Sequence, residues 1–514
     1  MTIPYLVHHF VEQIAQRRPE HPFLIHEGVS TSYGEAEAGA NRVARALLSA
    51  GLARGDRVGL LAQNSSFYVE GYYGILKSGG IAVPLNTAAN GSTLAKFLSG
   101  CGARMLIAGR RFERAAKQCI ERGTSLELLA VASRDRLPKL PASIRPLALD
   151  EACAAEAPEA PDLAFSDLDV ASIIYTSGST GTPQGATLSH LNLVSNTRSI
   201  VSYLELRPED RVLQILPFYY VYGKSLLNTH AFAGASVVIE NRFLYPNAAL
   251  DTLEAEACTG FSGVPSTFAI LLNRSNLAER ELPHLRYVTQ AGGAMSPELT
   301  RRLMDALPGK RIFIMYGATE ASARLSFLPP EELPRKIGSI GKAIPNVELR
   351  VLRSDGSEAA TNEHGEIVAR GPNLMSGYWG DPEGTAEALD EHGYHTGDIA
   401  YRDEEGFLFV VGRKKDFIKA GAHRISAKEI EEMILESEEI HEVAVIGVPD
   451  EILGEKICAF IVPREGHSLD TKVLEKVLKR KSPAYKIPSE FRVREDLPKN
   501  ESGKIMKHLL LEEQ

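Results

Sequence analysis

Short apolar runs alternate with stretches of helical spacing over roughly the first 335 residues. Residues 58–62 and 81–85 each predict a buried strand, and residues 68–77 between them predict a helix. A strand–helix–strand unit pairs its strands in parallel through a right-handed crossover. Further strands are predicted at residues 212–216, 236–239 and 311–315, so the expected fold class is α/β.

The pattern changes near residue 337. Residues 347–353, 365–370 and 400–411 form short alternating runs separated by turn residues, which predicts a small antiparallel, barrel-like β subdomain. Beyond Gly412, the charged run GRKKD predicts a hinge, and Ser426-Ala-Lys-Glu429 predicts a capping box at the start of a helix.

We therefore expect a large lobe at residues 1–411 and a mobile, small α+β domain at residues 417–514, joined by a hinge at residues 412–416. Within the large lobe we expect α/β subdomains at residues 1–167 and 168–336 and a β subdomain at residues 337–411. The Ala-, Glu- and Pro-rich segment 151–167 predicts a surface linker between the two α/β subdomains.

Composition narrows the class of protein. With 514 residues, 44% hydrophobic and 24% charged, the chain resembles an ordinary globular protein of several domains. A net charge of −9 argues against nucleic acid as a partner. No apolar run is long enough to span a membrane, and the N-terminus lacks the order of a signal peptide. Five scattered cysteines suit the reducing cytoplasm.

A glycine- and hydroxyl-rich stretch, YTSGSTGTPQG at residues 175–185, follows an apolar strand. Its backbone N–H and hydroxyl groups suit a polyphosphate, although no Walker-type Gly-Lys-Ser/Thr is present. The string resembles the phosphate loop of the adenylate-forming superfamily, which includes acyl-CoA synthetases, adenylation domains of peptide synthetases and luciferases. The resemblance implies that this loop binds ATP through Thr176, Ser177, Gly178, Ser179, Thr180 and Gly181.

Other motifs of that superfamily follow in the same order. A carboxylate after a strand suits Mg²⁺, and the resemblance assigns Glu320 to the metal and to catalysis. It assigns Asp398 and Arg413 to the ribose. It makes Lys504 the catalytic lysine, because an ammonium group stabilises negative charge shared by a carboxylate and a phosphate, and it gives Thr176 a catalytic role as well. The remaining implied ATP ligands are Gly292, Gly293, Ala294, Tyr316, Gly317 and Thr319.

The stretch 216–223 resembles the acyl-pocket motif. Val221 stands where amino-acid-activating relatives carry an Asp, and an apolar side chain cannot hold a buried ammonium group. We therefore expect an aryl or aliphatic acid rather than an α-amino acid. The implied pocket comprises Tyr219, Tyr220, Val221, Gly223, Val264, Gln290 and Ala291. For Phe218 and Tyr219, a role in the core is an equal alternative.

Gln184 departs from the family, which usually has lysine there. The departure predicts weaker contact with the β- and γ-phosphates, so Gln184→Lys is expected to lower the KM for ATP.

The resemblance implies two half-reactions, in which an acyl-adenylate forms and its acyl group then passes to a thiol. Lys415 is the implied hinge residue, and Lys419, Gly421 and His423 are implied to face the thiol tunnel. Our first interpretation is an ATP- and Mg²⁺-dependent carboxylic acid–CoA ligase. The alternatives are a stand-alone enzyme that loads the phosphopantetheine of a separate carrier protein, a luciferase-like oxygenase, and a non-catalytic nucleotide-binding relative.

Overall fold

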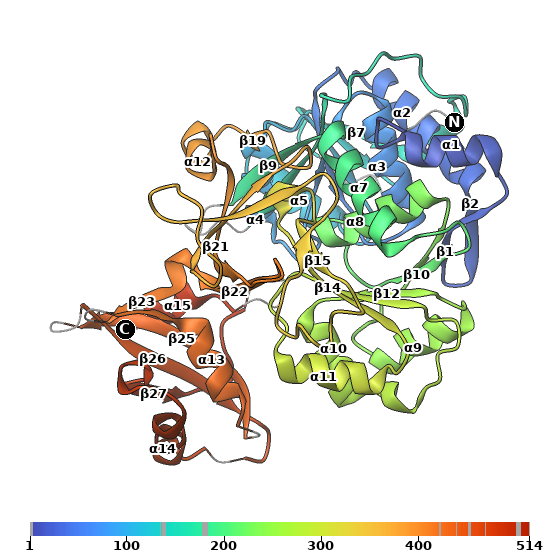
Figure 1. Ribbon diagram of the computed structural model, residues 1–514. Coiled ribbons are helices and arrows are strands. Elements are labelled where there is room, and N and C mark those ends of the chain that lie inside the picture. Colours follow the sequence, from blue (N-terminus) through green and yellow to red (C-terminus); the bar gives the residue numbers. More distant parts are fainter. Residues whose placement is uncertain are drawn as a thin grey trace. The chain divides into compact units, whose positions relative to one another are not determined.

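The structure is a computed structural model (Figure 1) that describes residues 4–133, 135, 140–176, 183–420, 423–437, 439–450, 454–467, 469–499 and 505–512. The chain forms two compact units. Unit 1 comprises Met1–Leu349 and Ala369–Tyr394, and unit 2 comprises Arg350–Val368 and His395–Gln514. Among the described residues, no helix combines the length and apolar character needed to cross a bilayer.

A nine-stranded sheet carries the central part of unit 1. Its strands, in spatial order, are β16 (Lys342–Ala343), β15 (Ser326–Leu328), β14 (Arg311–Tyr316), β13 (Tyr287–Gln290), β12 (Gly260–Gly263), β10 (Arg211–Gln214), β11 (Ser236–Ile239), β1 (Pro22–His26) and β2 (Val29–Ser32). The pairs from β14 to β1 are parallel. Figure 1 shows α9 (Pro246–Ala255), α10 (Pro265–Arg274) and α11 (Pro297–Ala306) together on one side of this sheet.

An eight-stranded sheet forms the second layer of unit 1. Its strands, in spatial order, are β19 (Gly377–Tyr378), β9 (Gln184–Ser189), β8 (Val170–Thr176), β4 (Ile81–Pro84), β3 (Arg57–Leu61), β5 (Met105–Ala108), β6 (Leu128–Val131) and β7 (Arg145–Ala148). The predicted strands at 58–62 and 81–85 are confirmed as β3 and β4, which pair in parallel across α3 (Ser66–Lys77). The expected α/β class is confirmed.

The two sheets exchange strands, so the expected boundary at residue 167 does not separate them. β1 and β2 lie in the nine-stranded sheet, where Leu24 is opposite Val237 of β11. β8 and β9 lie in the eight-stranded sheet, where Ser172 of β8 is opposite Ala82 of β4. Apolar patterning identifies a buried strand but not the sheet that it joins, which is why the boundary was misplaced.

The segment 151–167 is mostly exposed, as expected of a surface linker, but it does not join two subdomains, because β7 before it and β8 after it lie in the same sheet. Its start belongs to α6 (Leu149–Ala154). Beyond that helix, Asn41 Nδ2 donates to the carbonyl of Pro158 at 2.8 Å, and Arg45 Nε donates to that of Glu159 at 2.8 Å. Side chains of α2 (Tyr33–Ser49) thus hold the segment against unit 1.

The most extensive apolar core of unit 1 joins both sheets. It includes residues of β1, β3, β8 and β9 and of α2, α3, α7 (His190–Leu204) and α8 (Val221–Ala233). Ser32 and Ser189 cap α2 and α7, because each hydroxyl accepts the backbone N–H three residues on. The other helices of unit 1 are α1 (His9–Arg17), α4 (Gly91–Gly100), α5 (Glu113–Glu121) and α12 (Pro382–Ala388).

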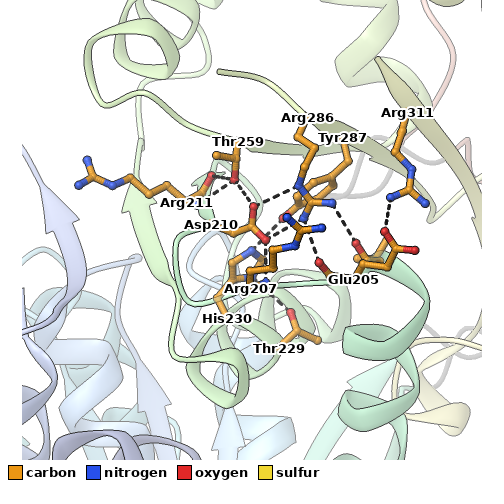
Figure 2. Close-up of polar contacts among 11 residues, drawn as sticks. Glu205, Arg207, Asp210, Arg211, Thr229, His230, Thr259, Arg286, Tyr287 and Arg311 are labelled. Carbon is orange, nitrogen blue, oxygen red and sulfur yellow. Dashed lines mark hydrogen bonds and ion pairs between the residues drawn. The ribbon is translucent and has the colours of Figure 1, made fainter. Parts of the chain in front are cut away.

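A polar network holds the amino-terminal ends of the parallel strands together (Figure 2). Asp210, which precedes β10 and is 4% exposed, accepts hydrogen bonds from Thr259 Oγ1 and Arg286 Nη2, each at 2.7 Å. Nearby, His230 Nε2 lies 2.9 Å from Tyr287 Oη. Because Thr259 and Arg286 precede β12 and β13, this network fixes one edge of the sheet through side-chain contacts.

Unit 2 contains antiparallel β structure followed by an α+β region. The first sheet has the order β17 (Glu348–Leu352), β18 (Gly365–Arg370), β21 (Gly393–Arg402), β20 (Leu389–Asp390), and β22 (Leu408–Arg413) pairs with β21. The second sheet contains β24 (His423–Ser426), β23 (Phe417–Ala420), β26 (Gly454–Pro463) and β25 (Ile440–Asp450), with β27 (Glu490–Val493) paired to β26. Its helices are α13 (Ala427–Leu435), α14 (Thr471–Lys481) and α15 (Lys507–Glu512).

The cap predicted at Ser426 is confirmed in part. Ser426 Oγ accepts the N–H of Glu429 at the start of α13. In a full capping box, the Glu429 carboxylate would accept the backbone N–H of Ser426. Here the carboxylate forms an ion pair with Lys486.

Candidate active site

Four neighbouring parallel strands of unit 1 end at one edge of the sheet. β14, β13, β12 and β10 are consecutive in the sheet order. Tyr316 ends β14, Gln290 ends β13, Val264 directly follows β12, and β10 leads into the stretch 216–223. Ligand groups gather at the carboxyl ends of strands in such sheets. The fold therefore brings the predicted ATP and acyl residues of four distant segments to one edge.

The turn after β14 requires glycine at position 317. A Cβ on Gly317 would lie 2.0 Å from the carbonyl oxygen of Ala323, which no side chain could tolerate. The tight turn leads into the short helix Thr319–Ala321, and Glu320 is half-buried there. A carboxylate oxygen of Glu320 accepts a hydrogen bond from Tyr378 Oη at 2.9 Å. Tyr378 therefore restricts how this carboxylate points.

The strands beside the phosphate loop are linked to the Glu320 turn through β19. Thr176 ends β8 opposite Gln184 of β9, and β19 is the other neighbour of β9. Met375, just before β19, donates its backbone N–H to the Glu320 carbonyl at 2.7 Å. The Gln184 amide donates to Asp381 Oδ2 at 2.9 Å. This hydrogen bond lowers the pKa of Asp381, and the hydrogen bond donated by Gly384 N–H lowers it further by a smaller amount. Ser177, Gly178, Ser179, Thr180 and Gly181 lie outside the described residues.

The stretch 216–223 is fixed by close packing. A Cβ on Gly223 would lie 2.1 Å from the Pro217 carbonyl oxygen, so only glycine fits where α8 begins. Phe218 is fully buried in the core of unit 1, which settles the alternative left open for it. Tyr219 is 9% exposed, and its ring centroid lies 4.5 Å from that of Tyr220.

The turn after β13 lies against the start of α10. Gln290 Nε2 donates to the carbonyl of Gly293 at 2.8 Å and closes the turn that contains Ala291 and Gly292. A Cβ placed on Gly292 would lie 3.1 Å from Val264 Cγ1, so the two predicted positions are neighbours.

Tyr222 connects α8 to β13, because its hydroxyl contacts Thr289 Oγ1 at 2.8 Å. The acyl-pocket stretch and the end of β13 are therefore held by direct contact.

Lys224 is a buried cation that no sequence motif predicts. This residue of α8 is 2% exposed, and its Nζ donates to Tyr68 Oη at 2.8 Å and lies 3.4 Å from the centroid of the Tyr72 ring. Burial lowers the pKa of Lys224 well below its ordinary value. An isolated lysine in an apolar helix gives no signal for such an environment, since the two tyrosines come from α3, far away in the sequence.

The second predicted group of ligands belongs to unit 2. Asp398 is 6% exposed, and its Oδ1 lies 2.9 Å from Nε of Arg413, its cross-strand partner on β22. Asp398 N–H donates to Thr396 Oγ1 at 3.1 Å. The predicted ribose ligands are thus neighbours on one hairpin.

Several predicted residues of the C-terminal region cannot be placed. Gly421 and Lys504 lie outside the described residues, and only the backbone is described for Lys415, Lys419 and His423. Their predicted roles as thiol-tunnel, catalytic and hinge residues stay predictions.

Comparisons with known proteins identify the family of the chain. The AMP-binding enzyme family matches residues 11–379, and the AMP-binding enzyme C-terminal domain matches residues 429–504. The long-chain-fatty-acid–CoA ligase of Bacillus subtilis is 30% identical over 97% of this chain and 93% of its own length. Feruloyl-CoA synthase of an Amycolatopsis species is 32% identical over 96% of both chains.

Solved structures show the same likeness. ATP-bound MatB from Rhodopseudomonas palustris has a TM-score of 0.89 and 29% identity, covering 98% of both chains. The o-succinylbenzoate–CoA synthetase MenE of Bacillus subtilis, in complex with ATP and a magnesium ion, has a TM-score of 0.85 and 28% identity, covering 98% of both chains. With both family domains matched in order along the chain, the protein belongs to the AMP-binding enzyme family and is an adenylate-forming acid–thiol ligase.

Proposed function

We propose that the protein uses ATP to convert a carboxylic acid to an acyl-adenylate and then transfers the acyl group to CoA. The observation that carries this proposal is the edge where β14, β13, β12 and β10 end side by side with the predicted ATP and acyl residues. The full-length similarity to two CoA ligases supports the same reaction.

In the first step, a carboxylate oxygen of the acid attacks the α-phosphorus of ATP. The bond from that phosphorus to the bridging oxygen breaks, and pyrophosphate leaves with the electron pair. In the second step, the CoA thiolate attacks the acyl carbon and AMP leaves. Phosphoryl chemistry of this kind depends on positioning and charge stabilisation rather than on covalent work by the protein.

Glu320 fits a magnesium ion. Its carboxylate is half-buried and oriented by Tyr378, and oxygen ligands are those that Mg²⁺ prefers. Bound Mg²⁺ would neutralise charge on the phosphates. Tyr316 lies at the end of β14, directly before the tight turn at Gly317. We assign it to the adenine together with Gly292, Gly293 and Ala294. Thr176 and the loop that follows it are assigned to the phosphates.

Two further assignments concern the rest of ATP and the developing charge. In unit 2, Asp398 and Arg413 are assigned to the ribose, since a carboxylate accepts hydrogen bonds from both ribose hydroxyls. Lys504 is assigned to the negative charge that forms as the acid meets the α-phosphate. The role of Lys504 rests on its sequence motif alone.

The acid is proposed to be an aryl or aliphatic one. Val221 starts α8 and packs against the apolar core of unit 1. It therefore offers no carboxylate to a substrate ammonium group. The two relatives, by name a fatty-acid ligase and a feruloyl-CoA synthase, bracket this substrate range.

We propose CoA as the acceptor and the reducing cytoplasm as the location. The relatives named above are CoA enzymes, whereas nothing favours a carrier protein as the acceptor. All five cysteines have free thiols, which suits a reducing compartment.

A pyrophosphate-release assay with ATP, Mg²⁺ and a panel of fatty, benzoic and cinnamic acids tests the proposal. We expect release that depends on one class of acid, and a matching acyl-CoA by mass spectrometry once CoA is added. A Glu320→Gln variant prepared in parallel identifies release by contaminating ligases. Nucleotide binding without pyrophosphate release from any acid would indicate a non-catalytic binder. Acyl-adenylate that never reaches CoA would exclude the CoA ligase.

A further inference from the structure

The start of α1 gathers three metal-binding side chains outside the residues assigned to ATP. One potential ligand atom from each of His8, His9 and Glu12 lies within 4.8 Å of the others. His8 is 3% exposed, while His9 and Glu12 are half-buried. Two imidazoles and a carboxylate in mutual reach are the donor set of many zinc sites.

The imidazole groups are also incompletely satisfied. Nδ1 of His8 and Nδ1 of His9 are both buried, and neither has a hydrogen-bond partner within the part of the chain that the structure describes. Buried polar atoms in native proteins nearly always have a partner, so two such nitrogens on rings whose centroids lie 5.0 Å apart point to a missing ligand. His190 accepts the backbone N–H of Val7 through Nδ1 at 3.1 Å, and its ring centroid lies 5.6 Å from that of His8.

Neighbouring side chains hold Glu12 only through long contacts, because Gln16 Nε2 lies 3.5 Å from Oε1 and Lys77 Nζ lies 3.4 Å from Oε2. Lys77 is buried and pairs with Glu37 at 2.6 Å, closer than with Glu12 at 3.4 Å. Lys77 therefore keeps a carboxylate partner if Glu12 turns toward a cation. The two carboxylates outnumber the one lysine, which favours a positively charged ligand.

We propose that His8, His9 and Glu12 bind a divalent transition-metal ion of the zinc class. Three protein ligands leave a position for water in a tetrahedral site. No residue of α1 is assigned to the ligase reaction, so the site would lie apart from the residues assigned to ATP and the acid. The metal would link His8, which precedes α1, to His9 and Glu12 in the first turn of that helix. α1 itself packs on α2 and α8. Metal binding to the folded chain alone raises the stability of that chain.

Cobalt titration of the full-length protein, freed of any affinity tag and stripped with chelator, tests the proposal. We expect one equivalent of Co²⁺ to bind with visible absorption bands, to be displaced by Zn²⁺, and to raise the melting temperature. His9→Gln and Glu12→Gln should each weaken binding at least tenfold. His284→Gln, which changes an exposed histidine, should bind as the wild type does.

Circular dichroism first shows that the metal-free variants melt as the wild type does, so a difference in binding reflects the lost ligand and not unfolding. Binding lost in both ligand variants and kept in His284→Gln supports it. A folded wild type that takes up no stoichiometric Co²⁺ would overturn it, as would binding that survives both ligand substitutions. ATP and acid are absent throughout, so the result is independent of the proposed ligase activity.

Discussion

Tyr378 donates a hydrogen bond to the carboxylate that we assign to magnesium, and this contact yields a prediction at the scale of one residue. Tyr378→Phe removes the hydroxyl while leaving the ring. Hydrogen bonds to charged groups contribute about 1.5–3 kcal/mol, so we expect the Mg²⁺ concentration for half-maximal activity to rise about tenfold. At saturating Mg²⁺, kcat should fall much less. Tyr245→Phe, at an exposed tyrosine, is the control, and an unchanged Mg²⁺ dependence in Tyr378→Phe would contradict the assignment.

Gln184 shows how a contact changes an expectation from sequence. Its amide is directed to Asp381, which caps α12 by accepting Gly384 N–H. A lysine at position 184 would pair with this carboxylate instead of reaching a phosphate. We now expect Gln184→Lys to change the KM for ATP by less than about twofold. The double variant Gln184→Lys/Asp381→Asn, which keeps a capping side chain, should lower it. A several-fold lower KM in the single variant would restore the original expectation.

The sequence identifies individual residues where strand ends and motifs coincide. Tyr316 and Gln290 end parallel strands, so their place at one sheet edge follows from the pattern of apolar runs. Tyr378 and Lys224 escaped prediction for a physical reason. Each is defined by a side chain from a remote segment, Glu320 for the first and Tyr68 for the second, and no local pattern contains that pairing.

At the scale of elements, buried strands could be predicted well and their sheet membership could not. The runs 236–239 and 365–370 match β11 and β18 residue for residue, because each run has clear apolar character and ends at a turn. The pairing of β1 with β11 depends on contacts between segments more than 200 residues apart. Local pattern carries no information on such pairing.

His230, on α8, gives a pH prediction for the network at the amino-terminal edge. Burial lowers its pKa to about 4, against an ordinary value of 6.5. Above pH 6.5 both folded and unfolded chains hold it neutral, so its contribution to stability is fully present. As the pH falls below 6.5, only the unfolded chain takes up the proton, so the free energy of unfolding decreases until about pH 4. At pH 5 the loss is about 2 kcal/mol.

Comparing thermal unfolding at pH 7 and pH 5 in the wild type and in His230→Gln measures this contribution. The variant should lose less stability between the two pH values, because it lacks the titrating group. The effects of carboxylates, common to both proteins, cancel in the difference. Equal losses in the two proteins would show that His230 does not titrate in this range.

At the scale of the whole molecule, Lys415 tests whether the two half-reactions use separate states of the chain. Proline fixes φ and restricts the preceding residue as well. We expect Lys415→Pro to retain acid-dependent pyrophosphate release and to lose most acyl-CoA formation, because a backbone change at the hinge is needed only for the second step. Lys415→Ala is the matched control. A parallel loss of both half-reactions in Lys415→Pro would refute the hinge assignment.

The exchange of strands between the two sheets of unit 1 has a consequence for synthesis. β1 is translated about two hundred residues before its parallel partner β11. Contacts so distant in sequence form slowly, and unpaired strand edges invite aggregation. The edge of β1 that pairs with β11 must therefore remain unpaired or protected until residue 239 has emerged, whereas its other edge can pair with β2 at once. A polypeptide divided at residue 167 would give two pieces that each lack strands, so neither piece should fold until it meets the other.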